Sequence, residues 1–388
     1  MSPDARVTEL RPADPREGLP SRDQLSLRTR AVVEASALAD VGLRTLAASM
    51  VTASVLPLAL SPKRLRDERA ALAFYGSLTA AADIERSFPA PLGDHPVRAR
   101  RVSPIPLRGQ QGTVELLSFE SRFAAVNPAL REAYAAHRQN RIARAQHWRH
   151  TDGEGRRPTL CVIHGFTASP YWVNSAFFSL PWFFHNGYDV LLFTLPFHGR
   201  RQSRRSPYSG HGTFAHGFAN LNEAMAQAVH DFRVFTSYLL DTSASQVGVT
   251  GLSLGGYTSA LLAAVEDRLQ LCVPNAPVTD FPAVMRSWHP AGQVLRGAMA
   301  LGRIPAEEVD QALRYSSPLT YEPLVPKERR MIVAGLGDRL APPEQGEWLW
   351  EHWDRCRMHW FPGNHVLHVN RVAYLREMRD LMADVDFR

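Results

Sequence analysis

The sequence predicts an α/β fold with a mostly parallel central sheet and helices on both faces. Short apolar runs, for example 160–163, 190–193 and 331–334, alternate with segments of helix length. Continuous runs of this kind are typical of parallel strands that are covered on both faces. Another such run leads into a serine within a glycine-rich turn at 249–256. A serine turn of this type on a doubly covered sheet indicates an enzyme that uses a serine nucleophile.

The eight expected strands and three expected helical segments follow from apolar runs and apolar spacing. The strands are 114–119, 142–149, 160–163, 190–193, 247–249, 271–273, 331–334 and 358–361. The helical segments are 128–140, 221–239 and 372–382.

The chain divides into four expected regions. Residues 1–24 are rich in charges and prolines and predict a flexible tail, and 25–112 predict a helical N-terminal extension. Residues 113–388 form the expected catalytic domain, in which 276–329 has a helical pattern and no strand signal. Because this insertion lies between two expected strands, we expect it to form a helical cap over the active site.

Composition limits the partners and the location. The net charge is +6, but the arginines are dispersed and no nucleic-acid-binding motif is present, so no nucleic-acid partner is expected. Three cysteines and a first 30 residues without a secretory pattern favour a cytoplasmic protein. The uncharged run 45–61 is expected to pack as a helix, with insertion into or weak association with a membrane as the alternative. The oligomeric state is left open.

Ser253 is the expected nucleophile. It stands in a G-x-S-x-G-G turn between an expected strand and an expected helix, where only small neighbours fit and the hydroxyl is exposed to a base. The strand at 160–163 ends in a His-Gly-Phe turn. The backbone N–H groups of Phe166 and Leu254 are therefore the expected oxyanion hole, and His164 is expected to hold the turn or to contact substrate.

The general base and its acid follow the last two strands. His365 stands on a tight turn after 358–361 and is the expected base, with His368 as the alternative. Asp338 follows 331–334 and is expected to orient the histidine, with Asp280 as the alternative acid. The order serine, aspartate, histidine is the one found in one large class of serine hydrolases.

No metal or cofactor is expected. The nearest histidine and cysteine groups are His211 with His216, and His352 with Cys356 and His359. Neither has the paired spacing of a zinc site, and no phosphate-binding or dinucleotide-binding glycine loop is present.

From about residue 114 to its end, the chain resembles the α/β-hydrolase superfamily in these motifs. The segments 140–143 (NRIA), 195–200 (LPFHGR) and 251–258 also resemble the poorly characterised subfamily around abhydrolase domain-containing protein 18. The resemblance implies triad roles for Ser253, Asp338 and His365. His198 and Arg200 follow an expected strand and are expected either to contact a polar part of the substrate or to stabilise the turn.

The leading hypothesis is a serine hydrolase that cleaves a small-molecule carboxylic ester with an apolar, lipid-like acyl group through an acyl-enzyme. One alternative is an acyltransferase that uses the same acyl-enzyme. A second is a catalytically silent, membrane-associated protein of the same fold.

Overall fold

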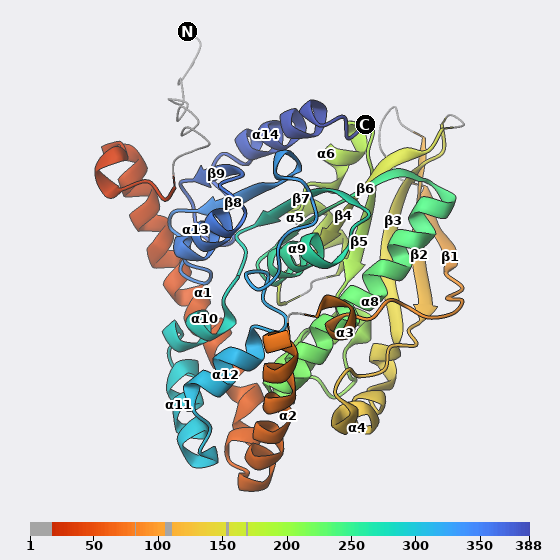
Figure 1. The fold of residues 1–388 in the computed structure, drawn as a ribbon. Coiled ribbons are helices and arrows are strands. Elements are labelled where there is room, and N and C mark those ends of the chain that lie inside the picture. The colour runs from red at the N-terminus through yellow and green to blue at the C-terminus, as the bar shows by residue number, and fades with distance from the viewer. Residues whose placement is uncertain (1–17, 82, 105–110, 153–154, 168–169) are drawn as a thin grey trace.

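Nine strands form a single twisted sheet in the order β1-β2-β3-β5-β4-β6-β7-β8-β9 (Figure 1). The computed structural model describes residues 18–81, 83–104, 111–152, 155–167 and 170–388. The strands from β5 to β9 in this order pair in parallel, whereas β1, β2 and β3 pair antiparallel at one edge. The predicted mostly parallel sheet is therefore confirmed.

The strands are β1 Arg98–Pro104, β2 Gly112–Glu120, β3 Ile142–His150, β4 Arg157–Ile163, β5 Asp189–Thr194, β6 Ala244–Leu252, β7 Leu269–Asn275, β8 Met331–Gly335 and β9 Arg357–Phe361. The helices are α1 Leu27–Ala59, α2 Pro62–Ala81, α3 Ile84–Ser87, α4 Arg131–Ala135, α5 Tyr171–Phe177, α6 Leu180–His185, α7 His211–Ala215, α8 Phe218–Thr242, α9 Leu254–Val265, α10 Phe281–Ser287, α11 Ala291–Gly302, α12 Ala306–Leu313, α13 Pro343–His352 and α14 Arg371–Asp384. Each of the eight predicted strands is present.

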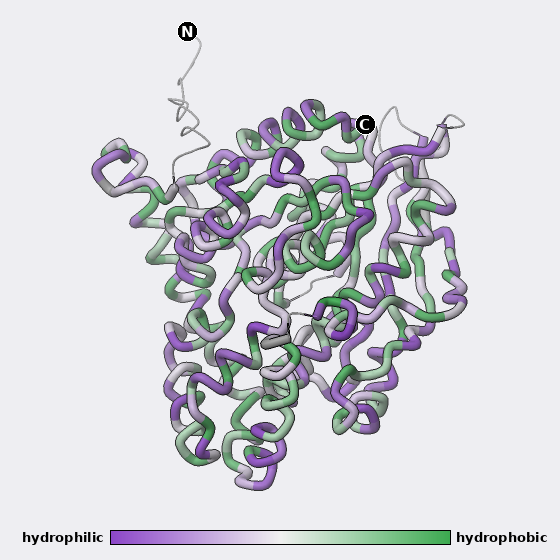
Figure 2. The backbone as a smooth tube through the Cα atoms, in the orientation of Figure 1, coloured by the Kyte–Doolittle hydropathy of each residue, from purple (hydrophilic) through white to green (hydrophobic). Residues whose placement is uncertain are grey.

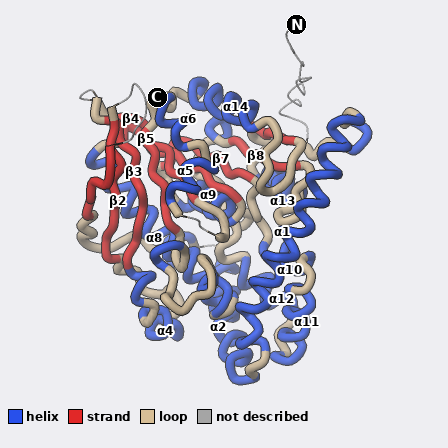
Figure 3. The backbone as a smooth tube through the Cα atoms, turned by 180° about the vertical axis from the view of Figure 1, so that it is seen from behind, coloured by secondary structure: helices blue, strands red, loops and turns tan. Residues whose placement is uncertain are grey.

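Two hydrophobic cores lie on the two faces of the sheet. On one face, strand residues such as Val249 pack with α8, α9 and α13, and on the other face residues such as Leu160 pack with α6 and α14. Figure 3 shows the second face, with α5 and α6 in front of the central strands. Burial of each large apolar side chain contributes about 1.5–3 kcal/mol, so the two cores fix the strand ends that carry the site.

Two predicted segments differ from the structure. The range 25–112 contains strand β1, which carries four charged or polar residues among its seven and so lacks an apolar pattern. Charged side chains are usual on an edge strand, where they prevent pairing with other chains. The range 128–140 is not one helix: α4 covers only five residues, between 3₁₀ turns at Pro128–Leu130 and Arg138–Arg141. Most of the predicted tail, 1–17, lies outside the described residues.

Helices α1, α2, α11 and α12 lie together toward the end of the molecule that is lowest in Figure 1. Helices α1 and α2 from the N-terminal region pack against α11 and α12 from the insertion at 276–329, and α1 also packs against α7. The two helical segments thus form one layer, although more than two hundred residues separate them.

Helix α1 has small or polar residues on its inner face and leucines on its outer face. Ser36 and Ala48 are buried, whereas Leu38 and Leu46 are 76% and 59% exposed. Apolar stretches along α1 appear green in Figure 2. By length and composition α1 could cross a membrane. Its most apolar stretch of 18 residues has a mean hydropathy of 1.4, and 17% of that stretch is buried.

Candidate active site

Ser253 occupies a strained turn between β6 and α9. Its φ of 59° and ψ of −115° lie outside the conformations that non-glycine residues usually adopt. The turn is held by its backbone: the Ser253 N–H donates to the Asn275 carbonyl at 3.0 Å, and the Tyr257 N–H donates to the Ser253 carbonyl at 2.8 Å. Strain of this kind persists only where the surrounding structure imposes it, and it often marks a functional site.

The flanking glycines allow the serine turn to pack against the neighbouring strand. A Cβ atom on Gly255 would lie 2.1 Å from the Ile163 carbonyl oxygen, and one on Gly251 would lie 2.5 Å from the Gly255 carbonyl oxygen. Both contacts are shorter than van der Waals packing permits. The glycine spacing seen in the sequence is therefore required by backbone contacts.

The turn after β4 passes beside the serine. A Cβ atom on Gly165 would lie 3.7 Å from the Ser253 Cβ atom, and Phe166 lines the same pocket as Ser253. Leu254 is the first residue of α9, and the first N–H groups of a helix have no partner within it. The two predicted oxyanion donors, Phe166 and Leu254, thus both belong to segments that border the serine.

His365 and Asp338 are directly hydrogen-bonded. The distance from His365 Nδ1 to Asp338 Oδ2 is 2.7 Å, and both side chains are buried. Asp338 Oδ1 accepts hydrogen bonds from the N–H groups of Leu340, at 2.9 Å, and Ala341, at 2.8 Å. With Nδ1 donating to the carboxylate, the other ring nitrogen, Nε2, is the one able to accept a proton.

The charge of Asp338 governs the protonation of His365. Burial by itself lowers the pKa of this imidazole, but attraction to the Asp338 carboxylate, with a smaller contribution from Asp40, outweighs burial and raises the pKa above its usual value. A histidine with a raised pKa is a stronger base, which suits proton transfer from a hydroxyl group.

The two alternative residues have other partners. Asp280 caps α10, where its carboxylate accepts the Ala283 N–H at 2.8 Å. The ring of His368 packs on Phe361, with centroids 4.4 Å apart, and burial lowers its pKa to about 3. Among the described contacts, the histidine that binds Asp338 is His365.

His164 and His198 are buried groups that hold backbone turns. His164 accepts the Leu195 N–H at its Nε2 atom, 3.1 Å away, and its Nδ1 atom is 2.8 Å from the Gly165 carbonyl. His198 Nδ1 lies 2.8 Å from the Pro196 carbonyl. Burial lowers the pKa of His164 to about 3 and that of His198 to about 4, so both are neutral near pH 7. The predicted role in the turns is therefore present for both residues, and their contact with a substrate stays a prediction.

Asp40 is a site residue that the sequence did not reveal. Its buried carboxylate extends from α1 and accepts the Arg339 N–H at 2.6 Å, next to Asp338. From the same helix, the Ser36 carbonyl accepts the side-chain amide of Asn364, next to His365, at 2.9 Å. The available signal was an aspartate on a helix face whose other buried residues are small and uncharged, but its partner is distant in sequence.

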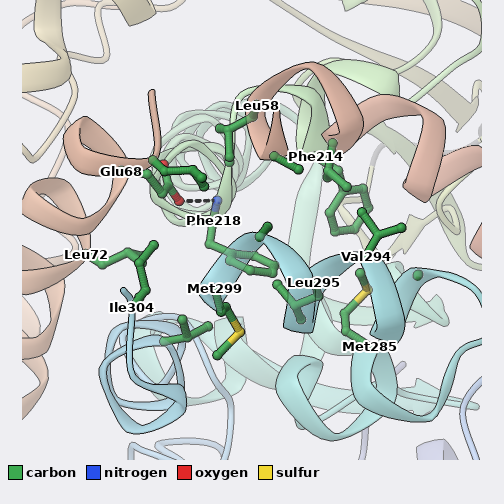
Figure 4. Close-up of a pocket in the computed structure, with 17 residues that line it drawn as sticks. Leu58, Glu68, Leu72, Phe214, Phe218, Met285, Val294, Leu295, Met299 and Ile304 are labelled. Atoms are coloured by element: carbon green, nitrogen blue, oxygen red, sulfur yellow. Dashed lines mark hydrogen bonds between the residues drawn. The ribbon is translucent and has the colours of Figure 1, made fainter. Parts of the chain in front are cut away.

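The pocket at Ser253 is narrow and apolar. Its volume is about 30 Å³, and its lining includes Val51 of α1 and Met285 of α10. A second apolar pocket, of about 50 Å³, lies between α1, α2 and α11 and shares Phe214 and Met285 with the first (Figure 4). Glu68 is the one charged residue in the wall of the second pocket. The two pockets are therefore adjacent cavities that share these two side chains, and together they are called the apolar path.

Helix α5, which follows the oxyanion turn and carries Tyr171, Trp172 and Phe177, lines neither pocket. Trp172 is 75% exposed, Phe177 packs on Phe178, and the Tyr171 hydroxyl lies 3.0 Å from Thr194 Oγ1. Helices α1, α7 and α10 supply the walls in its place. Within the described ranges, no three His, Cys, Asp or Glu side chains are grouped as metal ligands.

Comparison with known proteins identifies the fold. Two acetyl xylan esterases, from Paenibacillus sp. R4 and from Thermoanaerobacterium sp., superpose with a TM-score of 0.53 at 14% and 15% identity. Each alignment covers 84% of this chain and 99% of the other. The chain therefore has the α/β-hydrolase fold.

Comparison by sequence gives less. No family model matches the chain. Two uncharacterised proteins of Mycobacterium tuberculosis, MT2702 and Rv2627c, are 32% identical to it over 225 residues, which is 54% of this chain. The chain spans about half the length of these curated relatives.

Proposed function

We propose that this chain is a serine hydrolase that cleaves a carboxylic ester through an acyl-enzyme intermediate. The observation that carries the proposal is the 2.7 Å hydrogen bond between His365 and Asp338. This pair lies at the end of the parallel strands where Ser253 occupies its strained turn. The acetyl xylan esterase names of the two superposed structures support an ester as the bond that is cleaved. The narrower resemblance to the subfamily around abhydrolase domain-containing protein 18 remains part of the proposal.

In the proposed reaction, Ser253 Oγ attacks the ester carbonyl carbon while His365 Nε2 takes the hydroxyl proton. The negative charge on the carbonyl oxygen is held by the N–H groups of Phe166 and Leu254. His365 returns the proton to the departing alkoxide, so an alcohol leaves and the acyl group stays on Ser253. A water molecule, deprotonated by the same histidine, then releases the carboxylic acid.

The pocket favours an apolar acyl group. Apart from Ser253, its lining is apolar, and it shares Phe214 and Met285 with the adjacent second pocket. Both pockets are small, so an acyl chain has to displace side chains, and methionine is the apolar residue that rearranges most easily. We also propose a cytoplasmic protein with weak affinity for membrane surfaces, which the exposed leucines of α1 support.

Labelling by a fluorophosphonate probe tests the proposal, because such probes react with activated serines. We expect one labelled residue, Ser253, and no labelling or ester turnover in Ser253→Ala. The matched control is Ser77→Ala, since Ser77 is an exposed serine on α2. Labelling that persists in Ser253→Ala, or wild-type protein that is neither labelled nor active, would contradict the assignment.

A further inference from the structure

Four arginines surround a cavity of about 200 Å³ at the antiparallel edge of the sheet. Arg98 and Arg100 come from β1, Arg144 from β3, and Arg200 from the turn after β5. Tyr171 of α5 also lines the cavity. In Figure 3, none of the described helices lies in front of β2 and β3 at this edge. The cavity therefore opens on a sheet face that the helical layers leave uncovered.

The strand register aligns the basic side chains. Arg98 is paired with Ser118, Ser118 with Arg144, and Arg144 with Thr194, across four neighbouring strands. Directly opposed residues on neighbouring strands point to the same face of a sheet. Arg100, two residues after Arg98, points to that face as well. The backbone pairing therefore places Arg98, Arg100 and Arg144 on one face of the sheet, whichever rotamers their side chains adopt.

These arginines have no counter-ion in the described part of the chain. No hydrogen bond or ion pair is found there for the side chains of Arg98, Arg100, Arg144 or Arg200, and the Arg144 Nε atom is buried without a partner. The nearest carboxylate on this face of β2, Glu120, is already bound to Arg141 at 2.7 Å. The positive charge that gathers at the cavity is left uncompensated.

Protection of the edge strand explains only part of this pattern. Charged residues on β1 keep the sheet from pairing with other chains, which accounts for Arg98 and Arg100. Arg144 lies on β3, two strands further into the sheet, and is half-buried. Burial, and after it repulsion from Arg200 and Arg201, lowers the pKa of its guanidinium group, so the charged form is disfavoured. A half-buried arginine among other arginines is costly unless an anion joins them.

We propose that this cavity binds the phosphate group of a small molecule. Guanidinium groups bind phosphate oxygens in pairs of parallel hydrogen bonds, and several of them around one cavity favour a multiply charged anion over a single carboxylate. The Tyr171 hydroxyl supplies a neutral hydrogen-bond donor at the same cavity. The site does not depend on the chemistry of Ser253.

The phosphate comes either from the ester substrate or from a separate ligand. Strands β3 and β6 are separated by three strand spacings of about 4.8 Å, or roughly 14 Å. Arg144 is paired with the last residue of β5, and Ser253 follows the last residue of β6, so the cavity and the serine lie at the same end of the parallel strands. One extended molecule can therefore reach both places.

Calorimetric titration with inorganic pyrophosphate at low salt tests the site. We expect saturable binding to the wild type and to Ser253→Ala, and binding that is weaker by about ten-fold or more in R100Q/R144Q. The matched control is R28Q/R66Q, which removes two exposed arginines elsewhere and should bind as the wild type does. Ser253→Ala lacks the proposed nucleophile, and the titration measures binding alone. The result therefore stands even if the proposed hydrolase activity is wrong.

Two further measurements complete the test. Inhibition of p-nitrophenyl butyrate hydrolysis by pyrophosphate indicates that the phosphate belongs to the ester substrate, and binding without inhibition indicates a separate ligand. Should R100Q/R144Q fail to fold, pyrophosphate is expected to protect the four arginines of the wild type from phenylglyoxal. Absence of binding, equal affinity in the two double variants, or absence of protection would overturn the proposal.

Discussion

The backbone N–H of Arg339 donates a 2.6 Å hydrogen bond to the carboxylate of Asp40, which lies 299 residues earlier in the chain. Asp40 is fully buried, and its charge adds to that of Asp338 in raising the pKa of His365. The pKa of Asp40 is itself raised, mainly by burial. Helix α1 is therefore part of the support of the proposed catalytic pair, in addition to its place in the helical layer.

Asp40→Asn tests this role. Removing the charge should lower the apparent pKa in the pH profile of kcat/KM, because Asp40 favours the protonated form of His365. We also expect kcat to fall by roughly three- to ten-fold, as one charge-assisted hydrogen bond to the Arg339 N–H becomes a neutral one. Asp67→Asn, on the exposed surface of α2, is the control. An unchanged pH midpoint would mean that Asp40 is merely structural.

The pH dependence of the wild type follows from the sign of the His365 shift. Only the neutral imidazole accepts a proton, and its pKa is raised above the ordinary value of 6.5. Ester turnover should therefore rise with pH, with a midpoint above 6.5. In Asp338→Asn, burial then dominates and lowers the pKa, and kcat should fall by about 10⁴-fold because the ring loses its orienting partner. A midpoint below 6.5 in the wild type would contradict the assignment.

The strands that are buried on both faces could be predicted from the sequence, because each of them contains an apolar run. Strands such as β4, β5 and β8 are covered on both faces, so nearly all their residues are buried and each strand contains a run of at least four apolar residues. Strand β1 lies at the sheet edge, and its arginines follow from that exposed position. Its pairing with β2 depends on the register between two strands, which no local pattern of residues records.

The candidate site likewise has some residues that a sequence pattern marks and others that no pattern marks. Ser253, Asp338 and His365 stand in turns with glycines at which a Cβ atom would meet backbone oxygen atoms, so these turns leave a glycine pattern in the sequence. Asp40 and the apolar path depend on how α1 packs against loops far along the chain. Such contacts become visible only in the folded structure.

Substitution of Gly255 tests the backbone contacts of the serine turn. In Gly255→Ala the new methyl group would lie 2.1 Å from the Ile163 carbonyl oxygen, so we expect a loss of at least several kcal/mol of stability or failure to fold. In Gly297→Ala, on the exposed side of α11, nothing lies within 4 Å. Alanine there should stabilise the helix by about 0.5–1 kcal/mol. Chemical denaturation measures both changes, and similar stabilities for the two variants would contradict the packing.

Met285→Trp tests the apolar path. Met285 lines both pockets, so a larger ring there should keep a long acyl chain from extending from the first pocket into the second. With p-nitrophenyl esters of increasing chain length, kcat/KM for the octanoate should fall about ten-fold or more relative to the acetate. The control is Leu301→Trp, because Leu301 is an exposed residue of α11. An unchanged chain-length profile in Met285→Trp would place the acyl chain elsewhere.

Glu68→Gln tests a buried carboxyl group that links α2 to α8. The Glu68 carboxylate accepts the N–H groups of Phe218 and Ala219 at 2.7 and 3.1 Å, but burial raises its pKa from 4.5 to about 7. Between these two values the folded chain keeps a proton that the unfolded chain has lost, so stability should fall as pH rises through this window.

The shift of Glu68 corresponds to a loss on the order of 2–3 kcal/mol across the window. Glutamine keeps an oxygen that can accept both N–H groups but does not titrate, so this part of the pH dependence should disappear in Glu68→Gln. Glu85→Gln, an exposed position on α3, should keep the wild-type slope. Urea denaturation at pH 5 and pH 7.5 measures the difference. Equal slopes in Glu68→Gln and the wild type would show that Glu68 is ionised throughout, with its charge stabilised by the N-terminus of α8.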